Sequence, residues 1–224
     1  MSFLRTLLIV IFGIFLNNHS ISSDRTSCFG SNIKSWNNCF GTAFYGTHKY
    51  QGDFKNGVPN GYGIYEFSTG NKYEGEFKNG NFNGKGIYNF SSGDKYEGEF
   101  KNNKRHGQGI YIYKSGGKYI GEYQNDQPNG RGVSIFASGN KYEGEFKNGT
   151  RHGQGVFTFK NGEKYIGEYQ DNQPNGRGVS IFPNGSKYEG EFKNGKFNGE
   201  GIFTYASGKT KQGIWKDNKF SYSK

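Results

Sequence analysis

Polar and apolar positions alternate within a short stretch that recurs along most of the chain. In the copy at 72–80, KYEGEFKNG, the two aromatic residues and the first glycine fall on one side of an extended strand and the charged residues on the other. Alternation with a period of two is typical of a half-exposed β-strand. Asn79-Gly80 tolerates positive φ at both residues and favours a tight turn. A second strand over 84–90 and a turn over 91–94 follow, so each copy is predicted to be one β-hairpin.

The spacing of the copies is constant. Their leading tyrosines lie 23 residues apart, and a degenerate copy begins at Lys211. These tyrosines are Tyr50, Tyr73, Tyr96, Tyr119, Tyr142, Tyr165 and Tyr188. A fixed period of this length is the signature of stacked repeats, in which each unit packs against its neighbours. We therefore expect an all-β fold, an elongated single-layer antiparallel sheet of about fifteen to seventeen strands and roughly 70–80 Å in length.

Composition limits what such a sheet can use as a core. Only 31% of the residues are hydrophobic, whereas 18% are aromatic and 38 residues are glycine. Leucine is almost confined to the first 16 positions, so aliphatic packing cannot supply the core. Glycine inside a strand costs stability unless something packs on the bare backbone. We predict that Tyr and Phe rings from neighbouring strands cover these glycines.

The same rings form the candidate binding face, because no helix is predicted to cover the sheet. A row of partly exposed rings beside glycines would make a groove for an extended peptide, a partner strand or a glycan. Alternatively, twist and curvature let the rings cover one another and leave no groove. The candidate residues are Tyr73, Phe77, Phe90, Tyr96, Phe100, Tyr119, Tyr123, Tyr142, Phe146, Tyr165, Tyr169, Tyr188 and Phe192.

The chain outside the full repeats divides into three predicted parts. Residues 1–22 have the form of a secretory signal, with Arg5 before an apolar run at 7–16 and small residues at 20–22. An uncleaved membrane anchor through 7–16 is the alternative. Residues 23–49 form a predicted N-terminal cap with a half repeat at 38–44, seven full repeats occupy 50–210, and 211–224 is a degenerate repeat or tail.

Both cysteines of the chain lie in the predicted cap. In an exported protein, Cys28 and Cys39 most simply form a disulfide that closes a small loop. A pair of free buried thiols is the alternative. Two cysteines alone are too few for a zinc site.

The pattern Y-E-G-E-F-K-N-G-x-x-x-G-x-G resembles the MORN repeat (membrane occupation and recognition nexus). The resemblance covers about Tyr50–Gly208 and implies an elongated antiparallel sheet that serves binding and scaffolding rather than catalysis. The fifth position is usually Phe or Tyr here, and Trp stands there only at Trp215. Histidine of the family pattern is matched only by His106 and His152, whereas the other copies have Asn60, Asn83, Asn129, Asn175 and Asn198.

The positive charge is spread along the chain. The formal net charge is +10, of which the seven full copies carry +4, mostly in the copy at 96–118. That copy supplies a candidate basic patch, Lys101, Lys104, Arg105, Lys114 and Lys118. Most copies balance Lys against Glu, whereas a nucleic-acid binder concentrates basic residues on one face, so no nucleic-acid partner is expected. An anionic membrane surface is permitted as a partner, although basic residues favour it only when clustered close to lipid.

The side chains that could serve in catalysis recur at equivalent positions of the repeat, which favours structural roles for them. His106 and His152 occupy equivalent turn positions about four strands, roughly 19 Å, apart, too far to share a metal ion. Pairs such as Glu74 and Glu76 recur with flanking lysines, which favours cross-strand charge pairing over acid–base catalysis. No phosphate-binding loop or nucleophile elbow is present. We therefore expect no enzyme activity, no cofactor and no metal.

A second level of repetition spans two copies. Lys95–Asn140 and Lys141–Ser186 match at 33 of 46 positions. Duplication is the simplest explanation, and a functional two-repeat period is the alternative. Together these features predict an exported, non-catalytic scaffold that binds a protein or an envelope polymer through its long aromatic face. Peripheral binding to anionic phospholipid head groups is the alternative function.

Overall fold

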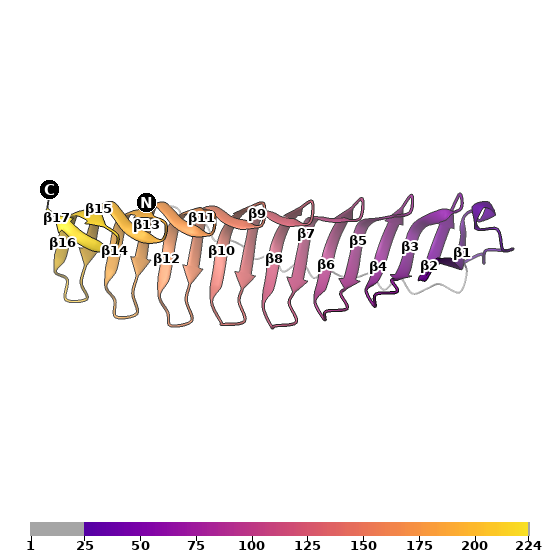
Figure 1. Cartoon of the computed structure of the whole chain (residues 1–224), viewed down its shortest axis with the longest axis horizontal. Coiled ribbons are helices and arrows are strands. Elements are labelled where there is room, and N and C mark those ends of the chain that lie inside the picture. Colours follow the sequence, from indigo (N-terminus) through magenta and orange to yellow (C-terminus); the bar gives the residue numbers. More distant parts are fainter. Residues whose placement is uncertain (1–24, 224) are drawn as a thin grey trace.

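One antiparallel sheet makes up almost all of the described chain. The computed structural model describes residues 25–223. The 17 strands follow one another in sequence order, each paired with its neighbours, from β1 at one end to β17 at the other (Figure 1). The elements are η1 (Ile33–Ser35), β1 (Cys39–Tyr45), β2 (His48–Lys55), β3 (Val58–Glu66), β4 (Lys72–Lys78), β5 (Asn81–Asn89), β6 (Lys95–Lys101), β7 (Lys104–Ile112), β8 (Lys118–Gln124), β9 (Gln127–Ile135), β10 (Lys141–Lys147), β11 (Thr150–Thr158), β12 (Lys164–Gln170), β13 (Gln173–Ile181), β14 (Lys187–Lys193), β15 (Lys196–Thr204), β16 (Thr210–Lys216) and β17 (Lys219–Tyr222). The predicted all-β hairpin repeat is confirmed.

Each repeat is one hairpin closed by a two-residue turn. We count positions from the leading tyrosine as position 1, and we number the repeats from repeat 1 at 50–72 to repeat 7 at 188–210. The turn residues at positions 7 and 8 both have positive φ, as in Asn79 (51°) and Gly80 (80°). This is the geometry of a type I′ turn, which matches the twist of the flanking strands. Where position 8 is not glycine, Asn or Asp takes its place, as at Asn103 with φ of 67°.

The second strand of each hairpin bends sharply at the glycine at position 12. These glycines have φ between +60° and +114°. Beside each bend, the carboxylate at position 4 accepts a hydrogen bond from the backbone N–H at position 13, at 2.9–3.3 Å in repeats 1 to 6. A Cβ atom added to Gly130 would lie 2.7 Å from the carboxylate of Glu122, so the bend requires glycine. The strands consequently curve over along one long edge of the sheet (Figure 1).

The bend encloses a continuous row of rings, which we call the aromatic ladder. In repeats 2 to 7, the ring at position 5 meets the tyrosine at position 1 of its own repeat and of the preceding repeat edge-on. Centroid distances along the whole ladder are 4.8–5.4 Å, and interplanar angles are 72–90°. From the N-terminal end, the ladder contains Trp36, Phe54, Tyr50, Phe77, Tyr73, Phe100, Tyr96, Tyr123, Tyr119, Phe146, Tyr142, Tyr169, Tyr165, Phe192, Tyr188 and Trp215.

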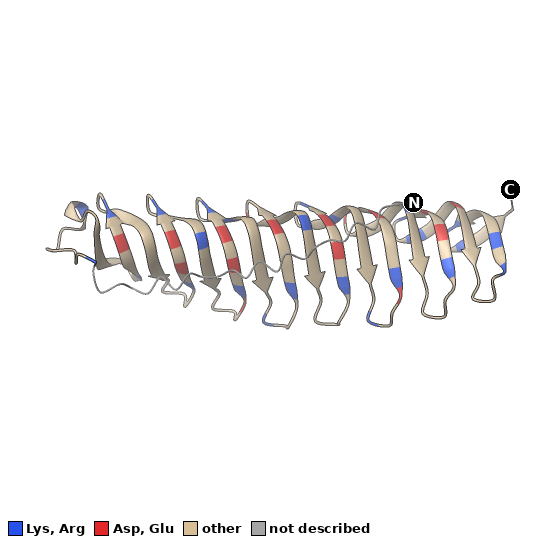
Figure 2. Ribbon diagram, turned by 180° about the vertical axis from the view of Figure 1, so that it is seen from behind, with Lys and Arg blue, Asp and Glu red and all other residues tan. Residues whose placement is uncertain are grey.

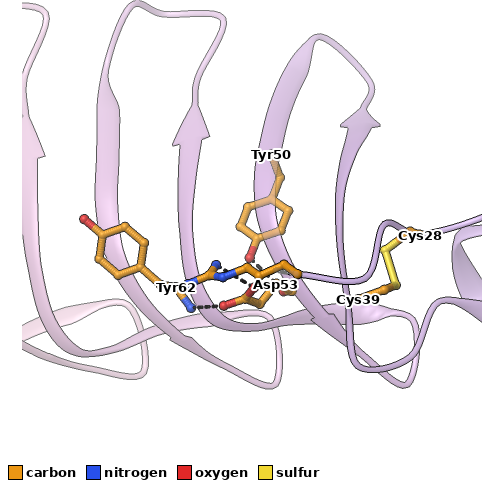
Figure 3. Close-up of polar contacts among 6 residues, drawn as sticks. Cys28, Cys39, Tyr50, Asp53 and Tyr62 are labelled. Carbon is orange, nitrogen blue, oxygen red and sulfur yellow. Dashed lines mark hydrogen bonds and ion pairs between the residues drawn. A yellow bond between two sulfur atoms is a disulfide. The ribbon is translucent and has the colours of Figure 1, made fainter. Parts of the chain in front are cut away.

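Each leading tyrosine is held through both its ring and its hydroxyl. The ring lies over the glycine at position 14, where an added Cβ on Gly155 would come 2.5 Å from Tyr142 Oη. The hydroxyl donates to the backbone carbonyl at position 4, at 2.8–3.1 Å in all seven repeats. Figure 3 shows this arrangement for Tyr50 and Asp53, with the N–H of Tyr62 bonded to the same aspartate. The predicted packing of rings on glycines is confirmed.

The residue at position 10 covers the leading tyrosine from the remaining side. Phe82 stacks on Tyr73 with 3.8 Å between centroids, and Phe197 stacks on Tyr188 in the same way at 3.7 Å. Arg105 takes this place in repeat 3, with its guanidinium carbon 5.7 Å from the centre of the Tyr96 ring. Arg151 does the same in repeat 5, and proline fills the position in repeats 1, 4 and 6.

The two ends of the ladder are closed differently. At the N-terminal end, Cys28 and Cys39 are joined by a disulfide, with Cα atoms 5.0 Å apart (Figure 3). Trp36 packs edge-on against Phe54 and donates from Nε1 to backbone carbonyls of the cap. At the other end, Trp215 donates from Nε1 to the carbonyl of Gly201, and only the four residues of β17 follow in the sheet. The predicted signal at 1–22 and the alternative anchor at 7–16 lie outside the described residues.

Candidate interaction surfaces

The predicted binding face is the core of the sheet. Twelve of the thirteen candidate rings belong to the aromatic ladder, and none of these exposes more than 7% of its surface. The remaining candidate, Phe90, is half-buried between Tyr88 and Tyr111. The prediction of a partly exposed groove is wrong, because the bend folds the sheet over its own rings. The alternative in which the rings cover one another describes the molecule.

Burial also fixes the ionisation state of the ladder. Burial raises the pKa of Tyr188 to about 12, with a smaller contribution from Glu191. Burial likewise raises the pKa of the other leading tyrosines above the ordinary value of 10.0. Each hydroxyl therefore stays protonated near neutral pH and keeps its hydrogen bond to the carbonyl at position 4. These groups hold the fold together and offer no acid or base to solvent.

The opposite side of the same strands is exposed, and we call it the outer face. It carries the side chains at positions 2, 4, 13 and 15, together with the lysine that precedes the leading tyrosine. In four repeats this lysine pairs with the glutamate at position 2, as in Lys141–Glu143 at 2.7 Å. The glutamate at position 4 instead binds the backbone at the bend, as Glu76 does with the N–H of Lys85. The predicted cross-strand charge pairing of the two glutamates is therefore wrong. The glutamate at position 2 pairs with a lysine of its own strand, and the glutamate at position 4 binds the backbone.

Repeats 4 and 6 depart from this pattern in the same way. Isoleucine replaces the glutamate at position 2, and Ile120 and Ile166 expose 37% and 42% of their surfaces. Each isoleucine lies between two aliphatic residues of the adjoining strands, Ile110 and Val133 beside Ile120, and Val156 and Val179 beside Ile166. We call these two rows the aliphatic patches. Within residues 25–223, Lys118 and Lys164 beside them form no ion pair within 4.0 Å.

A hollow of the outer face lies against the second aliphatic patch. Its lining includes Ile166, Val179 and Ile202, with Glu189 and Glu191 on the next repeat. Arg177, which lies opposite Glu191 in the strand pair, also lines the hollow. The outer face around this hollow thus combines apolar side chains with charges of both signs.

Positive charge collects along the edge where the type I′ turns lie, which we call the lysine edge. Its members occupy positions 6 and 9, and all are exposed. They are Lys55, Lys78, Lys101, Lys104, Lys147, Lys193, Lys196, Lys216 and Lys219. Figure 2 shows most acidic residues within the strands and most basic residues near the strand ends. Sequence counting missed this segregation, because lysine at position 6 is balanced within its repeat by the glutamate bound at the bend.

Comparison with known proteins decides the family. The MORN repeat family matches seven consecutive segments, residues 50–72, 73–95, 96–118, 119–141, 142–164, 165–187 and 188–210. The chain belongs to the MORN-repeat family. Tandem MORN repeats indicate a repeat scaffold or interaction module. Comparison with curated proteins found no match.

Solved structures similar to this MORN-repeat chain resemble it only distantly. The TCP domain of SAS-4 (dCPAP) of Drosophila melanogaster, solved with a proline-rich motif of Ana2 (dSTIL), is 15% identical with a TM-score of 0.43, over 70% of this chain and 85% of that chain. The G-box domain of the microcephaly protein CPAP is 10% identical with a TM-score of 0.43, over 79% and 99%. A streptogramin B lyase is 12% identical with a TM-score of 0.20, over 87% and 74%.

The MORN repeats do not bring the five residues of the predicted basic patch together. Lys101 and Lys104 face each other at a type I′ turn, whereas Lys114 and Lys118 lie at the opposite ends of the strands. Arg105 is half-buried over the ladder and forms an ion pair with Asp126 at 3.2 Å. The prediction of one patch is wrong, because it grouped residues by sequence rather than by strand end.

The histidines of the MORN pattern are likewise separate. His106 lies in β7 and His152 in β11, four strands further along the sheet. Among residues 25–223, no group of three or more His, Cys, Asp or Glu side chains is placed to hold a metal ion. In the same part of the chain, no helix has the length and apolar character needed to span a membrane.

Proposed function

We propose that this MORN-repeat chain is an exported, non-catalytic scaffold that binds another protein through the outer face of repeats 4 to 6. The observation that carries the proposal is the pair of aliphatic patches centred on Ile120 and Ile166. At the same position in repeats 2, 3, 5 and 7, glutamate forms an ion pair with the preceding lysine. Isoleucine at two exposed positions adds nothing to the buried core, so it points to a contact outside the chain.

The chemistry of the patches defines the partner. Lys118 and Lys164 lie beside exposed isoleucines without the glutamate that neutralises the equivalent lysines. A protein segment that carries aliphatic and acidic side chains complements both features, because the aliphatic groups are buried and the carboxylates pair with the lysines. The two patches lie four strands apart, at a spacing of roughly 19 Å. One extended segment of about six residues spans that distance.

Export is supported by two features of the chain. The N-terminal sequence has the form of a secretory signal. The Cys28–Cys39 disulfide persists only in an oxidising compartment in most organisms. We propose that the mature protein begins after residue 22 and keeps this disulfide.

The experiment compares proteins captured from an envelope extract by the native chain and by Ile120→Glu/Ile166→Glu. This double variant restores the Lys–Glu arrangement of the neighbouring repeats, so the fold is expected to be unchanged. The matched control, Gln51→Glu/Gln212→Glu, introduces two glutamates at the same position in repeat 1 and in the degenerate copy that begins at Lys211. We expect a protein that binds the native chain and the control but not the double variant, and that binds the purified native chain directly. Identical sets of bound proteins for all three chains would contradict the proposal.

A further inference from the structure

The lysine edge carries a charge arrangement that folding alone does not favour. In three hairpins, lysines at positions 6 and 9 are directly opposite one another across the strand pair: Lys101 with Lys104, Lys193 with Lys196, and Lys216 with Lys219. Like charges directly opposite on one face of an antiparallel pair are destabilising. The same two positions hold Gln124 with Gln127 in repeat 4 and Gln170 with Gln173 in repeat 6. The hairpin therefore forms without lysine there.

The edge lysines are also left largely without acidic partners. The lysines of the outer face pair with glutamates in four repeats, at 2.7–3.3 Å. Among the nine lysines of the edge, all within the described residues, only Lys196 forms an ion pair, with Asp217 at 3.4 Å, and both side chains are more than half exposed. A surface ion pair of this kind contributes little energy. The positive potential of the edge is thus nearly uncompensated.

Two of the lysine pairs are adjacent at the C-terminal end and border a hollow. Lys193 and Lys196 close the β14–β15 hairpin, and Lys216 with Lys219 closes the next one. Lys193, Lys196 and Lys216 line the hollow between these hairpins. The polar lining also includes Asn194, Asn198, Ser221 and one carboxylate, Asp217, which pairs with Lys196. Ammonium groups beside amide and hydroxyl donors are suited to bind an oxyanion.

We propose that this C-terminal lysine site binds a linear polyphosphate chain. The facing lysine pairs of successive hairpins lie two strands apart, so they repeat at ~9.6 Å along the edge. A chain of phosphates meets them in succession and enters the hollow between the hairpins. A flexible chain links phosphates that can reach both lysine pairs and the hollow between them, whereas a lipid head group presents its phosphate singly. The site is independent of the aliphatic patches, which lie in repeats 4 and 6 on the outer face.

The test measures binding of a fluorescent inorganic polyphosphate chain to the mature protein. The variant Lys193→Gln/Lys196→Gln/Lys216→Gln/Lys219→Gln copies the glutamine pairs of repeats 4 and 6. The matched control, Lys72→Gln/Lys95→Gln/Lys141→Gln/Lys187→Gln, removes the same charge from the ion pairs of the outer face. We expect the site variant to weaken binding by at least about tenfold, the loss expected when several exposed ion pairs disappear, and the control to weaken it much less.

Three further arms of the experiment decide the chemistry. Replacing the four site lysines by arginine keeps the charge and is expected to preserve binding, which also shows that the site remains folded. Monomeric phosphate is expected to compete poorly, because it meets one lysine pair at a time. Equal loss of polyphosphate binding in the site variant and the control would overturn the proposal, because binding would then depend on the net charge of the protein and not on this site. Binding to phosphatidylglycerol vesicles through the same lysines, at least as tight as to polyphosphate, would assign the site to a membrane surface instead.

Discussion

The two faces of the same strands repeat with different strictness. On the ladder side, every repeat places tyrosine over glycine and donates its hydroxyl to the same backbone carbonyl. On the outer face, position 2 holds glutamate in some repeats, isoleucine in repeats 4 and 6, and glutamine in Gln51 and Gln212. Packing inside the bend leaves little choice of side chain, because rings and backbone lie in contact. Side chains of the outer face are not constrained by packing in this way, so they can vary to suit a binding partner.

The largest expected contrast comes from removing one ring from each environment. Tyr142→Ala removes a ring that is fully buried in the ladder, whereas Tyr113→Ala removes one that is 45% exposed. Loss of a buried aromatic side chain costs about 3–5 kcal/mol, while the exposed change is expected to cost less than about 1 kcal/mol. Urea unfolding monitored by circular dichroism gives both values. Similar midpoints for the two variants would contradict the assignment of the ladder as core.

Removing the disulfide tests whether the N-terminal cap stabilises only the end of the sheet next to it. Cys28 and Cys39 are 11 residues apart, and closing a short loop of this kind stabilises a chain by about 3 kcal/mol. Because each repeat contacts only its neighbours, Cys28→Ser/Cys39→Ser is expected to loosen the N-terminal cap and leave distant repeats unaffected. Hydrogen exchange should accelerate in β1 and β2 and remain unchanged in β8 to β17. Uniform acceleration along the chain would show that the cap stabilises the whole sheet.

A smaller effect is expected at the glycines beneath the rings. Gly155→Ala places a Cβ atom 2.5 Å from Tyr142 Oη, and crowding of this kind costs about 1–3 kcal/mol. The control is Gly149→Asn in a turn, where nothing lies within 4 Å and where Asn103 holds the equivalent position. Thermal unfolding should therefore shift for the first variant and hardly move for the second. Equal shifts would mean that backbone conformation, and not the ring, decides the need for glycine at position 14.

Sequence alone predicted the hairpin unit, because alternation and the Asn-Gly turn are local signals. It also predicted that rings cover strand glycines, since Gly86 and its equivalents have no other use in a strand. The lengthwise bend was not predicted, because it depends on positive φ at Gly84 together with the carboxylate of Glu76 bound to the N–H of Lys85. Without the bend, the sequence leaves open whether the rings form an exposed groove or cover one another. Equal counts of lysine and glutamate within each repeat likewise concealed the lysine edge.

Alkaline titration of the native protein tests the buried ladder most directly. Burial raises the pKa of Tyr188 to about 12 and that of Tyr142 above its ordinary value of 10.0. Because the folded pKa exceeds the unfolded one, the stability from these tyrosines is fully present below about pH 10 and is lost as pH rises through the folded pKa. We predict that the ladder tyrosines ionise only together with loss of the β-sheet circular dichroism signal. Ionisation of all 17 tyrosines while that signal persists would contradict the buried ladder.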